Sequence, residues 1–205
     1  MALILASKSQ SRRIVLEMFG FDFAVEPSKV DERSVQLEDP NKLTTAIAEM
    51  KAKAVAKTHQ QDTVIGIDTM VCKEKLLIGQ PNNEENAREI MRLLLGKWHD
   101  VYSGYCIISN ENVFLGNETS RLKLKLIDDS LFEEYISSGS WSGKAGGYNI
   151  SDSKFENFVE KVEGSKLNIV GLPAEKILPL IETASKQKAI NSIEKVEAKL
   201  FRGTL

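Results

Sequence analysis

The feature that most constrains the fold lies at the amino terminus, where an apolar run, a polar turn and a helical repeat follow one another. Residues 3–6 are apolar, residues 7–13 are mostly small hydroxyl or basic side chains, and apolar residues then recur at 14, 15, 18 and 19. That recurrence is typical of a helix with one buried face, and the run before it is typical of a buried strand. The order predicts strand, turn and helix, and hence an α/β protein.

The same turn is a candidate phosphate-binding site. The hydroxyls of Ser7 and Ser9 and free backbone N–H groups gather at the start of the helix, where the helix dipole favours anions. The Arg12 guanidinium can bind a phosphate through two N–H groups at once. A serine-rich helix start is more often a simple cap, so a purely structural turn is the alternative.

Composition limits the class of protein. With 205 residues, of which 42% are hydrophobic and 27% charged, the chain can bury the core of one domain or of two closely joined lobes. The formal net charge is −2 and lysines alternate with acids, which argues against nucleic acid or a membrane surface as a partner. No apolar run approaches the roughly 20 residues that span a bilayer, so we expect a soluble, cytoplasmic protein.

Neither the cysteines nor the histidines predict a metal centre. Cys72 and Cys106 lie in apolar, strand-like segments and are predicted to be buried, reduced thiols. His59 and His99 are forty residues apart, and neither has a second ligand-type residue at the spacing of a zinc site.

Periodicity and turn residues place the remaining elements in one α/β unit with a mixed sheet over residues 1–183, followed by a helical extension over 184–205. Helices are expected after caps at Asp39, Asn82 and Asp128. The expected strands are 21–25, 63–67 and 70–72 with a break at Asp68-Thr69, 76–81, 101–108, 113–127 and 155–163.

Three further segments contain candidate site residues. Lys51 lies at the edge of the apolar stripe of its helix, so its ammonium is either a snorkelling surface charge or a cation directed into a cleft. Asp68 follows a β-branched run at the expected carboxyl end of a central strand, where α/β sheets bind ligands. Residues 141–148 hold three glycines and Lys144, which lets the backbone approach a ligand closely but is a weak signal alone.

Four separated segments match, in order and separation, the motifs of a known family. They are Leu5-Ala6-Ser7-Lys8-Ser9 with Arg12, Ile65-Gly66-Ile67-Asp68-Thr69, Lys144-Ala145-Gly146-Gly147-Tyr148 and Asn168-Ile169-Val170-Gly171-Leu172-Pro173. On these residues the chain resembles the Maf family of nucleoside triphosphate pyrophosphatases, also called septum-formation proteins. The acidic pair Asp31-Glu32 in a long polar loop extends the likeness, which covers residues 3–183.

The resemblance implies an elongated domain of two lobes around the mixed sheet, with a central nucleotide cleft and a divalent cation, Mg²⁺ or Mn²⁺. It further implies a homodimer that hydrolyses a nucleoside triphosphate to the monophosphate and pyrophosphate. Glu32 and Asp68 would bind the metal, Asp68 would also activate water, and Lys51 would neutralise phosphate charge. The residues that the resemblance assigns to substrate binding are Ser7, Ser9, Arg12, Thr69, Gln80, Ser103, Lys144 and Ser151.

The chain departs from the family pattern within the expected site. Gln80 stands where the family usually has the lysine of a G-K-P motif, Ser151 where it commonly has glutamine, Gln10 where it has proline, and Ser103 where it has threonine. Because a neutral amide cannot replace a cation, an alternative is a catalytically weakened protein that binds nucleotide and acts through a partner. Lys8 and Lys144 are the cations that could compensate.

The resemblance also bears on the substrate. The A-G-G-Y-x-I segment is similar to that of members acting on dTTP and UTP, which predicts pyrimidine or modified nucleotides. A related inosine-triphosphate pyrophosphatase is a less favoured alternative.

Overall fold

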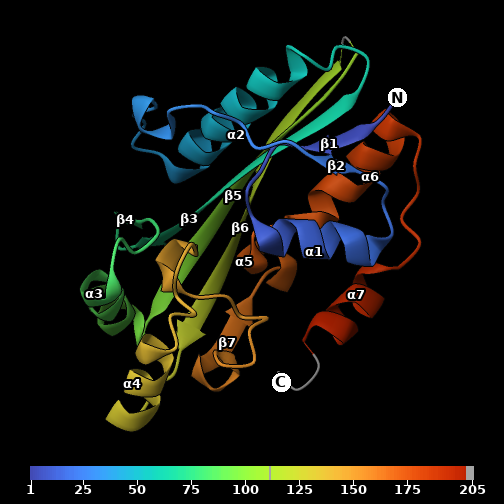
Figure 1. Cartoon of the computed structure of the whole chain (residues 1–205). Helices are drawn as coiled ribbons and strands as arrows, with labels where there is room; N and C mark the ends of the chain where they lie inside the picture. The colour runs from blue at the N-terminus through green and yellow to red at the C-terminus, as the bar shows by residue number, and fades with distance from the viewer. Residues whose placement is uncertain (111, 202–205) are drawn as a thin grey trace.

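A mixed β-sheet with helices packed on both faces forms the fold in the computed structural model, which describes residues 1–110 and 112–201 (Figure 1). Within these residues the sheet has seven strands in the order β2-β1-β3-β5-β6-β7, with β4 paired to β3. The predicted mixed α/β fold is confirmed. The strands are β1 (Leu3–Leu5), β2 (Ala24–Val25), β3 (Thr63–Lys73), β4 (Leu76–Ile78), β5 (Trp98–Ser109), β6 (Asn112–Leu124) and β7 (Val159–Glu163).

The centre of the sheet is the long antiparallel set β3, β5 and β6, and β1 runs parallel to both β2 and β3. The expected break of β3 at Asp68-Thr69 is wrong, because Asp68 pairs with Gly104 and Thr69 with Ser103 in an uninterrupted register. Strand hydrogen bonds use backbone groups only, so a polar side chain that has its own partner does not end the ladder. Asp68 therefore lies in the interior of a long strand.

The difference in length between β1 and β3 creates the open edge of the sheet. β1 ends at Leu5, paired with Ile65, whereas β3 continues to Lys73 and is joined by β4 only from Val71. The stretch of β3 between these two neighbours, which includes Asp68 and Thr69, has β5 on one side only. Side chains of successive strand residues point to opposite faces, so Asp68 and Thr69 meet different layers of helices at this edge.

The helices divide between the two faces of the sheet. Ala48, Ala52 and Val55 of α2 form one apolar cluster with Ile4 and Val64 of the strands, while the helices of the opposite layer pack on a larger cluster. The helices are α1 (Gln10–Phe19), α2 (Pro40–Ala56), α3 (Glu84–Leu94), α4 (Asp129–Ser137), α5 (Lys166–Val170), α6 (Ala174–Ser185) and α7 (Ile193–Leu200).

Two glycines let α2 approach the sheet closely. A Cβ atom at Gly66 of β3 would lie 2.2 Å from the carbonyl oxygen of Ala48, and one at Gly104 of β5 would lie 2.2 Å from the carbonyl carbon of Thr44. Neither contact is possible for a real side chain, so glycine is required at both positions. The close approach determines how near Lys51 of α2 comes to β3.

Several expected boundaries shift. The second strand is only Ala24–Val25, β7 begins at Val159, and the cap of α3 is Asn83, one residue later than expected, whose side chain accepts a hydrogen bond from Asn86 N. Cys72 and Cys106 are buried and free, as predicted, and burial raises the pKa of Cys106 to about 12. None of the helices in the described residues has the length and apolar character needed to cross a bilayer.

The segment over residues 190–200, which includes α7, packs against α1 (Figure 1). Ile190 N donates to Phe19 O at 2.8 Å, Asn191 Nδ2 donates to Met18 O at 2.7 Å, and Val196 of α7 is buried in the larger cluster. The helix expected in this region is therefore present and lies on the domain, although it begins at Ile193.

Candidate active site

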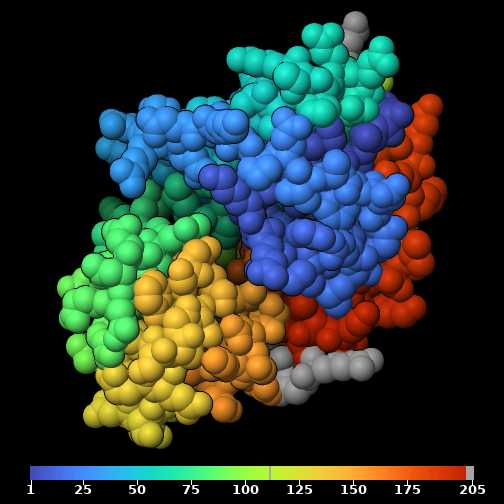
Figure 2. Space-filling model, viewed as in Figure 1, coloured from blue at the N-terminus to red at the C-terminus, as the bar shows by residue number. Residues whose placement is uncertain are grey.

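An open cavity of about 990 Å³ lies beside the exposed stretch of β3. Its walls come from the start of α1, the loop at residues 28–35, α2, β3, the segment at residues 79–82, the loop at residues 143–149 and the end of α5 at residues 169–171. Figure 2 shows the surface hollowed between the blue N-terminal segments and the green and yellow segments. The cavity thus lies between two lobes, where the sequence predicts a cleft.

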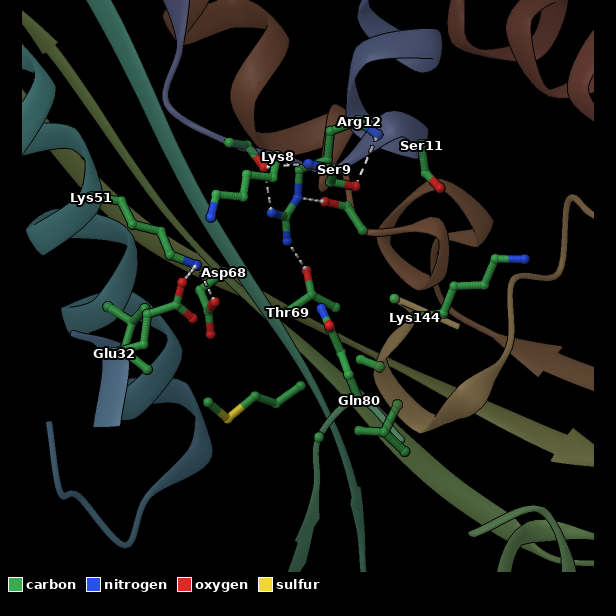
Figure 3. A pocket seen from close by; sticks show the side chains of 18 of the residues that line it. Lys8, Ser9, Ser11, Arg12, Glu32, Lys51, Asp68, Thr69, Gln80 and Lys144 are labelled. Atoms are coloured by element: carbon green, nitrogen blue, oxygen red, sulfur yellow. Dashed lines mark hydrogen bonds and ion pairs between the residues drawn. The ribbon is translucent and has the colours of Figure 1, made fainter. Parts of the chain in front are cut away.

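Lys51, Asp68 and Glu32 meet on one side of this cavity (Figure 3). Lys51 Nζ lies 2.6 Å from Asp68 Oδ1 and 3.0 Å from Glu32 Oε1. Lys51 and Asp68 are only 7% and 6% exposed, so burial of either charge alone would be costly and each stabilises the other. Of the two interpretations of Lys51, the cation directed into a cleft is the one observed.

Asp68 keeps one oxygen free. Its Oδ2 is buried and has no hydrogen-bond partner among the described residues. A buried carboxylate oxygen without a partner is unfavourable in a resting structure, and such groups commonly lie at sites that receive a ligand or a proton.

Arg12 links three parts of the cavity wall. Its Nε donates to Gly171 O at 2.8 Å, and its terminal nitrogens donate to Ser7 Oγ at 3.0 Å and Thr69 Oγ1 at 2.9 Å. Burial lowers the pKa of the guanidinium, and the nearby carboxylates of Asp68 and Glu32 oppose this effect. Three of the five N–H groups are therefore used within the protein, and one on each terminal nitrogen remains for a ligand.

The start of α1 is organised by its serines. Ser9 is the N-cap and accepts from Arg12 N, while Ser7 Oγ accepts from Ser9 N at 3.2 Å. Lys8 is exposed, and Figure 3 shows its ammonium directed into the space between Lys51 and Arg12. The turn is both a helix cap and one wall of a positively charged cavity.

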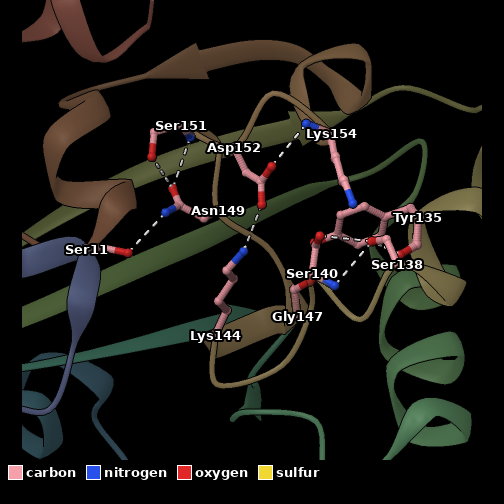
Figure 4. A network of polar contacts seen from close by, with 10 residues as sticks. All are labelled: Ser11, Tyr135, Ser138, Ser140, Lys144, Gly147, Asn149, Ser151, Asp152 and Lys154. Carbon is pink, nitrogen blue, oxygen red and sulfur yellow. Dashed lines mark hydrogen bonds and ion pairs between the residues drawn. The ribbon is translucent and has the colours of Figure 1, made fainter. Parts of the chain in front are cut away.

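Of the remaining residues expected to bind substrate, some line the cavity and others lie outside it. Thr69 lines the cavity, but Ser103 is fully buried behind it and bonds to Thr69 Oγ1 at 2.9 Å, so Ser103 supports Thr69 from outside the cavity. Gln80 lines the cavity and is exposed. Ser151 does not line the cavity; it bonds to Asn149, which does (Figure 4).

Lys144 lines the cavity wall, but its ammonium is paired with Asp152 Oδ2 at 3.0 Å and is directed away from Lys51 and Asp68 (Figures 3 and 4). Of the two cations that could compensate for Gln80, Lys144 is therefore engaged in an ion pair, whereas Lys8 has no ion-pair partner among the described residues.

Sequence reasoning missed several cavity residues. Lys29 and Arg33 flank the acidic pair in the long loop and line the cavity. Asn149 and Gly171 also line it but are not among the predicted site residues, although Asn149 lies between Lys144 and Ser151, which are. A sequence signal for Lys29 and Arg33 exists, because they are the only basic residues of the aperiodic loop over residues 27–38, whose length favours a functional role. The carbonyl of Gly171 has no sequence signal, since any residue supplies one.

The carboxylates fit a weakly held magnesium-type cation. Within the part of the chain that the structure describes, no group of three or more histidine, cysteine or acidic residues could hold a metal by itself. Mg²⁺ is commonly bound by one or two carboxylates together with waters and substrate phosphates. Glu32 and Asp68, with the free Oδ2, offer that donor set.

Fold and site together define an α/β protein with a cleft in which basic side chains surround a buried carboxylate at the open edge of the sheet. A family model described as "Maf-like protein" matches residues 2–184. The chain belongs to the Maf-like protein family.

Curated relatives cover nearly the whole chain. A protein from Pyrococcus furiosus named "dTTP/UTP pyrophosphatase" is 41% identical over 92% of this chain and 98% of its own length. Proteins of the same name from Thermococcus gammatolerans and Bacillus mycoides are 38% and 34% identical, over 88% and 86% of this chain and 95% and 92% of their own lengths.

Proposed function

We propose that this protein is a metal-dependent nucleoside triphosphate pyrophosphatase that acts on pyrimidine nucleotides. The observation that carries the proposal is the buried Asp68 carboxylate, whose Oδ1 is paired with Lys51 while its Oδ2 faces no partner among the described residues. The curated relatives are named dTTP/UTP pyrophosphatases, which supports the choice of dTTP and UTP.

The reaction needs an attacking water, a proton acceptor and stabilisation of the departing pyrophosphate. The oxygen of the water bonds to the α-phosphorus while Asp68 Oδ2 accepts a proton from that water. The bond between the α-phosphorus and the oxygen that bridges the α- and β-phosphates breaks, and pyrophosphate leaves. Lys51 and Lys8 balance the charge that develops on the leaving pyrophosphate. Arg12 holds Ser7 and Thr69 in place and has two N–H groups left for phosphate oxygens.

Glu32 and Asp68 are the residues that would hold a divalent cation in this cavity. When bound there, a cation such as Mg²⁺ or Mn²⁺ supplies charge stabilisation on the phosphate oxygens and orients the nucleotide. With its two carboxylates engaged in this way, the Lys51 ammonium would be available to pair with phosphate oxygens.

Release of pyrophosphate from a panel of triphosphates, with Mg²⁺ or Mn²⁺, tests the proposal. We expect dTTP and UTP to be the preferred substrates, and Asp68→Asn to abolish release because an amide cannot accept the proton. Asp100→Asn is the matched control, since Asp100 lies on the neighbouring strand β5, pairs with Arg121 and does not line the cavity. Absence of release from every triphosphate at high enzyme concentration would overturn the proposal.

A second candidate is a nucleotide-binding protein with little turnover. Gln80 favours it, because this cavity-lining position offers a neutral amide, and the nearby Lys144 is paired with Asp152. Calorimetric binding of dTTP without pyrophosphate release would support this candidate, whereas brisk turnover would exclude it. Comparing ITP with dTTP in the same assay tests the inosine-triphosphate alternative.

Three further parts of the proposal are a homodimer, which the family resemblance suggests, a cytoplasmic location, and a domain over residues 1–183 followed by a helical extension over residues 184–205. Light scattering of the purified protein tests the first of these.

A further inference from the structure

Asn149 is held in one orientation at the cavity wall (Figure 4). Its Oδ1 accepts from Ser151 N at 3.0 Å and from Ser151 Oγ at 2.9 Å, and its Nδ2 donates to Ser11 Oγ at 3.0 Å. Rotating the amide by half a turn would bring its NH₂ group against the backbone N–H of Ser151. Because two donors cannot pair, the Nδ2 side must face Ser11.

The orientation of Asn149 also determines what Ser11 can offer. Ser11 Oγ accepts from Asn149, so its own proton points elsewhere, and it has no acceptor for that proton in residues 1–110 and 112–201. Asn149 Nδ2 carries two N–H groups, of which Ser11 uses one. The pair therefore offers one O–H and one N–H donor to the cavity that both residues line.

The surroundings favour an anion as the acceptor for these donors. Ser11 lies in the first turn of α1, next to Arg12, where the helix dipole attracts negative charge. Asn149 comes from the opposite wall, and its segment is joined to that of Gln80 by the hydrogen bond from Gly146 N to Gly79 O at 3.0 Å. A phosphate group beside the Asn149–Ser11 contact would thus receive donors from both segments, one of which is joined to the segment of Gln80, where no cation is supplied.

We propose that Asn149 and Ser11 bind a phosphate group of the substrate, and that Ser151 is a positioning residue that holds the Asn149 amide for this contact. The proposal rests on the proposed function and deepens it, because it assigns the two residues to the phosphate chain and not to the nucleobase. It also gives Ser151 a role from outside the cavity.

Calorimetric titration with inorganic tripolyphosphate, which has no base, tests the proposal without turnover. We expect Asn149→Ala to weaken binding of tripolyphosphate and of dTTP by a similar factor of about 10, the loss expected for one hydrogen bond to a charged group. Asn149→Asp should weaken both further, because a carboxylate faces the phosphate. Asn157→Asp is the control with the same charge change, since Asn157 is exposed and does not line the cavity.

Ser11→Ala is an independent variant with the same expected loss, and Ser151→Ala should lose a few-fold through a less rigid amide, with recovery in Ser151→Thr, which keeps the hydroxyl. Thermal unfolding identifies any variant that fails to fold. The binding constants of the folded Asn149 and Ser11 variants for tripolyphosphate and dTTP then test the proposal. Unchanged tripolyphosphate binding with weakened dTTP binding would overturn the proposal in favour of base recognition. Wild-type protein that turns over dTTP without binding tripolyphosphate would overturn it too, whereas Asn149-dependent binding without turnover would refute only the proposed function.

Discussion

Lys51 Nζ lies 2.6 Å from Asp68 Oδ1 and 3.0 Å from Glu32 Oε1, so one ammonium is paired with two carboxylates. The ammonium thus neutralises both carboxylates that would hold a divalent cation. A cation arriving without nucleotide would have to displace an ion pair that is largely removed from water. Under the proposed function, this arrangement would favour entry of a metal together with the nucleotide, whose phosphates would give Lys51 a new partner.

Replacing Lys51 with methionine should therefore strengthen Mn²⁺ binding in the absence of nucleotide, by about tenfold or more, because the two carboxylates lose the ammonium that is paired with both of them. The same variant should be less stable without metal and should regain stability when Mn²⁺ is added. Titration of free Mn²⁺ by electron paramagnetic resonance and thermal unfolding measure both effects. Lys53→Met is the control, since Lys53 lies on the same helix and pairs with Glu49 at the surface. Equal Mn²⁺ affinity in wild type and Lys51→Met would contradict the prediction.

Restoring a cation at position 80 should accelerate turnover. Gln80 is exposed and lines the cavity, so Gln80→Lys adds a charge near the phosphates without a burial cost. We expect kcat/KM to rise by about 10-fold, the scale of one charge-assisted contact, with little change in thermal stability. Gln61→Lys, an exposed position that does not line the cavity, controls for net charge. A Gln80→Lys rate equal to wild type would show that the missing lysine does not limit this enzyme.

The contribution of sequence differs between the fold and the site. Periodicity predicted the strands and helices well, because burial of one face imposes it, but it placed a break in β3 where Asp68 interrupts the apolar pattern while the backbone ladder continues. Helical spacing singled out Lys51, the expected end of a strand singled out Asp68, and the family resemblance added Glu32; the structure brings the three together.

What sequence could not provide is the partner of each polar group. Arg12 donates to the carbonyl of Gly171, 159 residues away, and this contact depends on the packing of two layers. The sequence predicts Ser151 as a cavity residue, but the structure places Asn149 there, with Ser151 bonded to it from outside the cavity. Which of the two faces the cavity depends on the conformation of one turn, and a motif does not determine this.

The close contact between α2 and β3 predicts a strong effect at Gly66. An alanine methyl there would meet Ala48 O at 2.2 Å, so α2 must move away from the sheet, at a cost of about 1–3 kcal/mol or more. Because Lys51 and Asp68 lie on these two elements, the variant should also lose activity. Urea unfolding measures the first effect and pyrophosphate release the second. Gly79→Ala is the stability control, since nothing lies within 4 Å of its added methyl; equal destabilisation in both variants would refute the argument.

The final prediction concerns acid stability and His99, which is 2% exposed and whose Nε2 lies 2.7 Å from Tyr148 Oη. Burial lowers the pKa of His99 from 6.5 to about 4. Above pH 6.5 the histidine is neutral in both folded and unfolded chains, whereas between pH 6.5 and 4 only the unfolded chain binds the proton. As the pH decreases from 6.5 to 4, the free energy of unfolding should therefore decrease, and His99 should account for up to about 3 kcal/mol of this loss.

In His99→Gln, which keeps an acceptor for Tyr148, the fall in stability between pH 6.5 and 4 should be shallower than in wild type. Urea unfolding at half-unit pH steps measures both slopes. His59→Gln is a control that acts in a different pH window: a hydrogen bond to Glu26 raises the pKa of His59, so its contribution to stability changes above pH 6.5 and is constant below it. Removing His59 should lower stability below pH 6.5 by a constant amount and leave the slope between pH 6.5 and 4 unchanged. Equal slopes in wild type and His99→Gln would mean that the buried imidazole does not resist protonation.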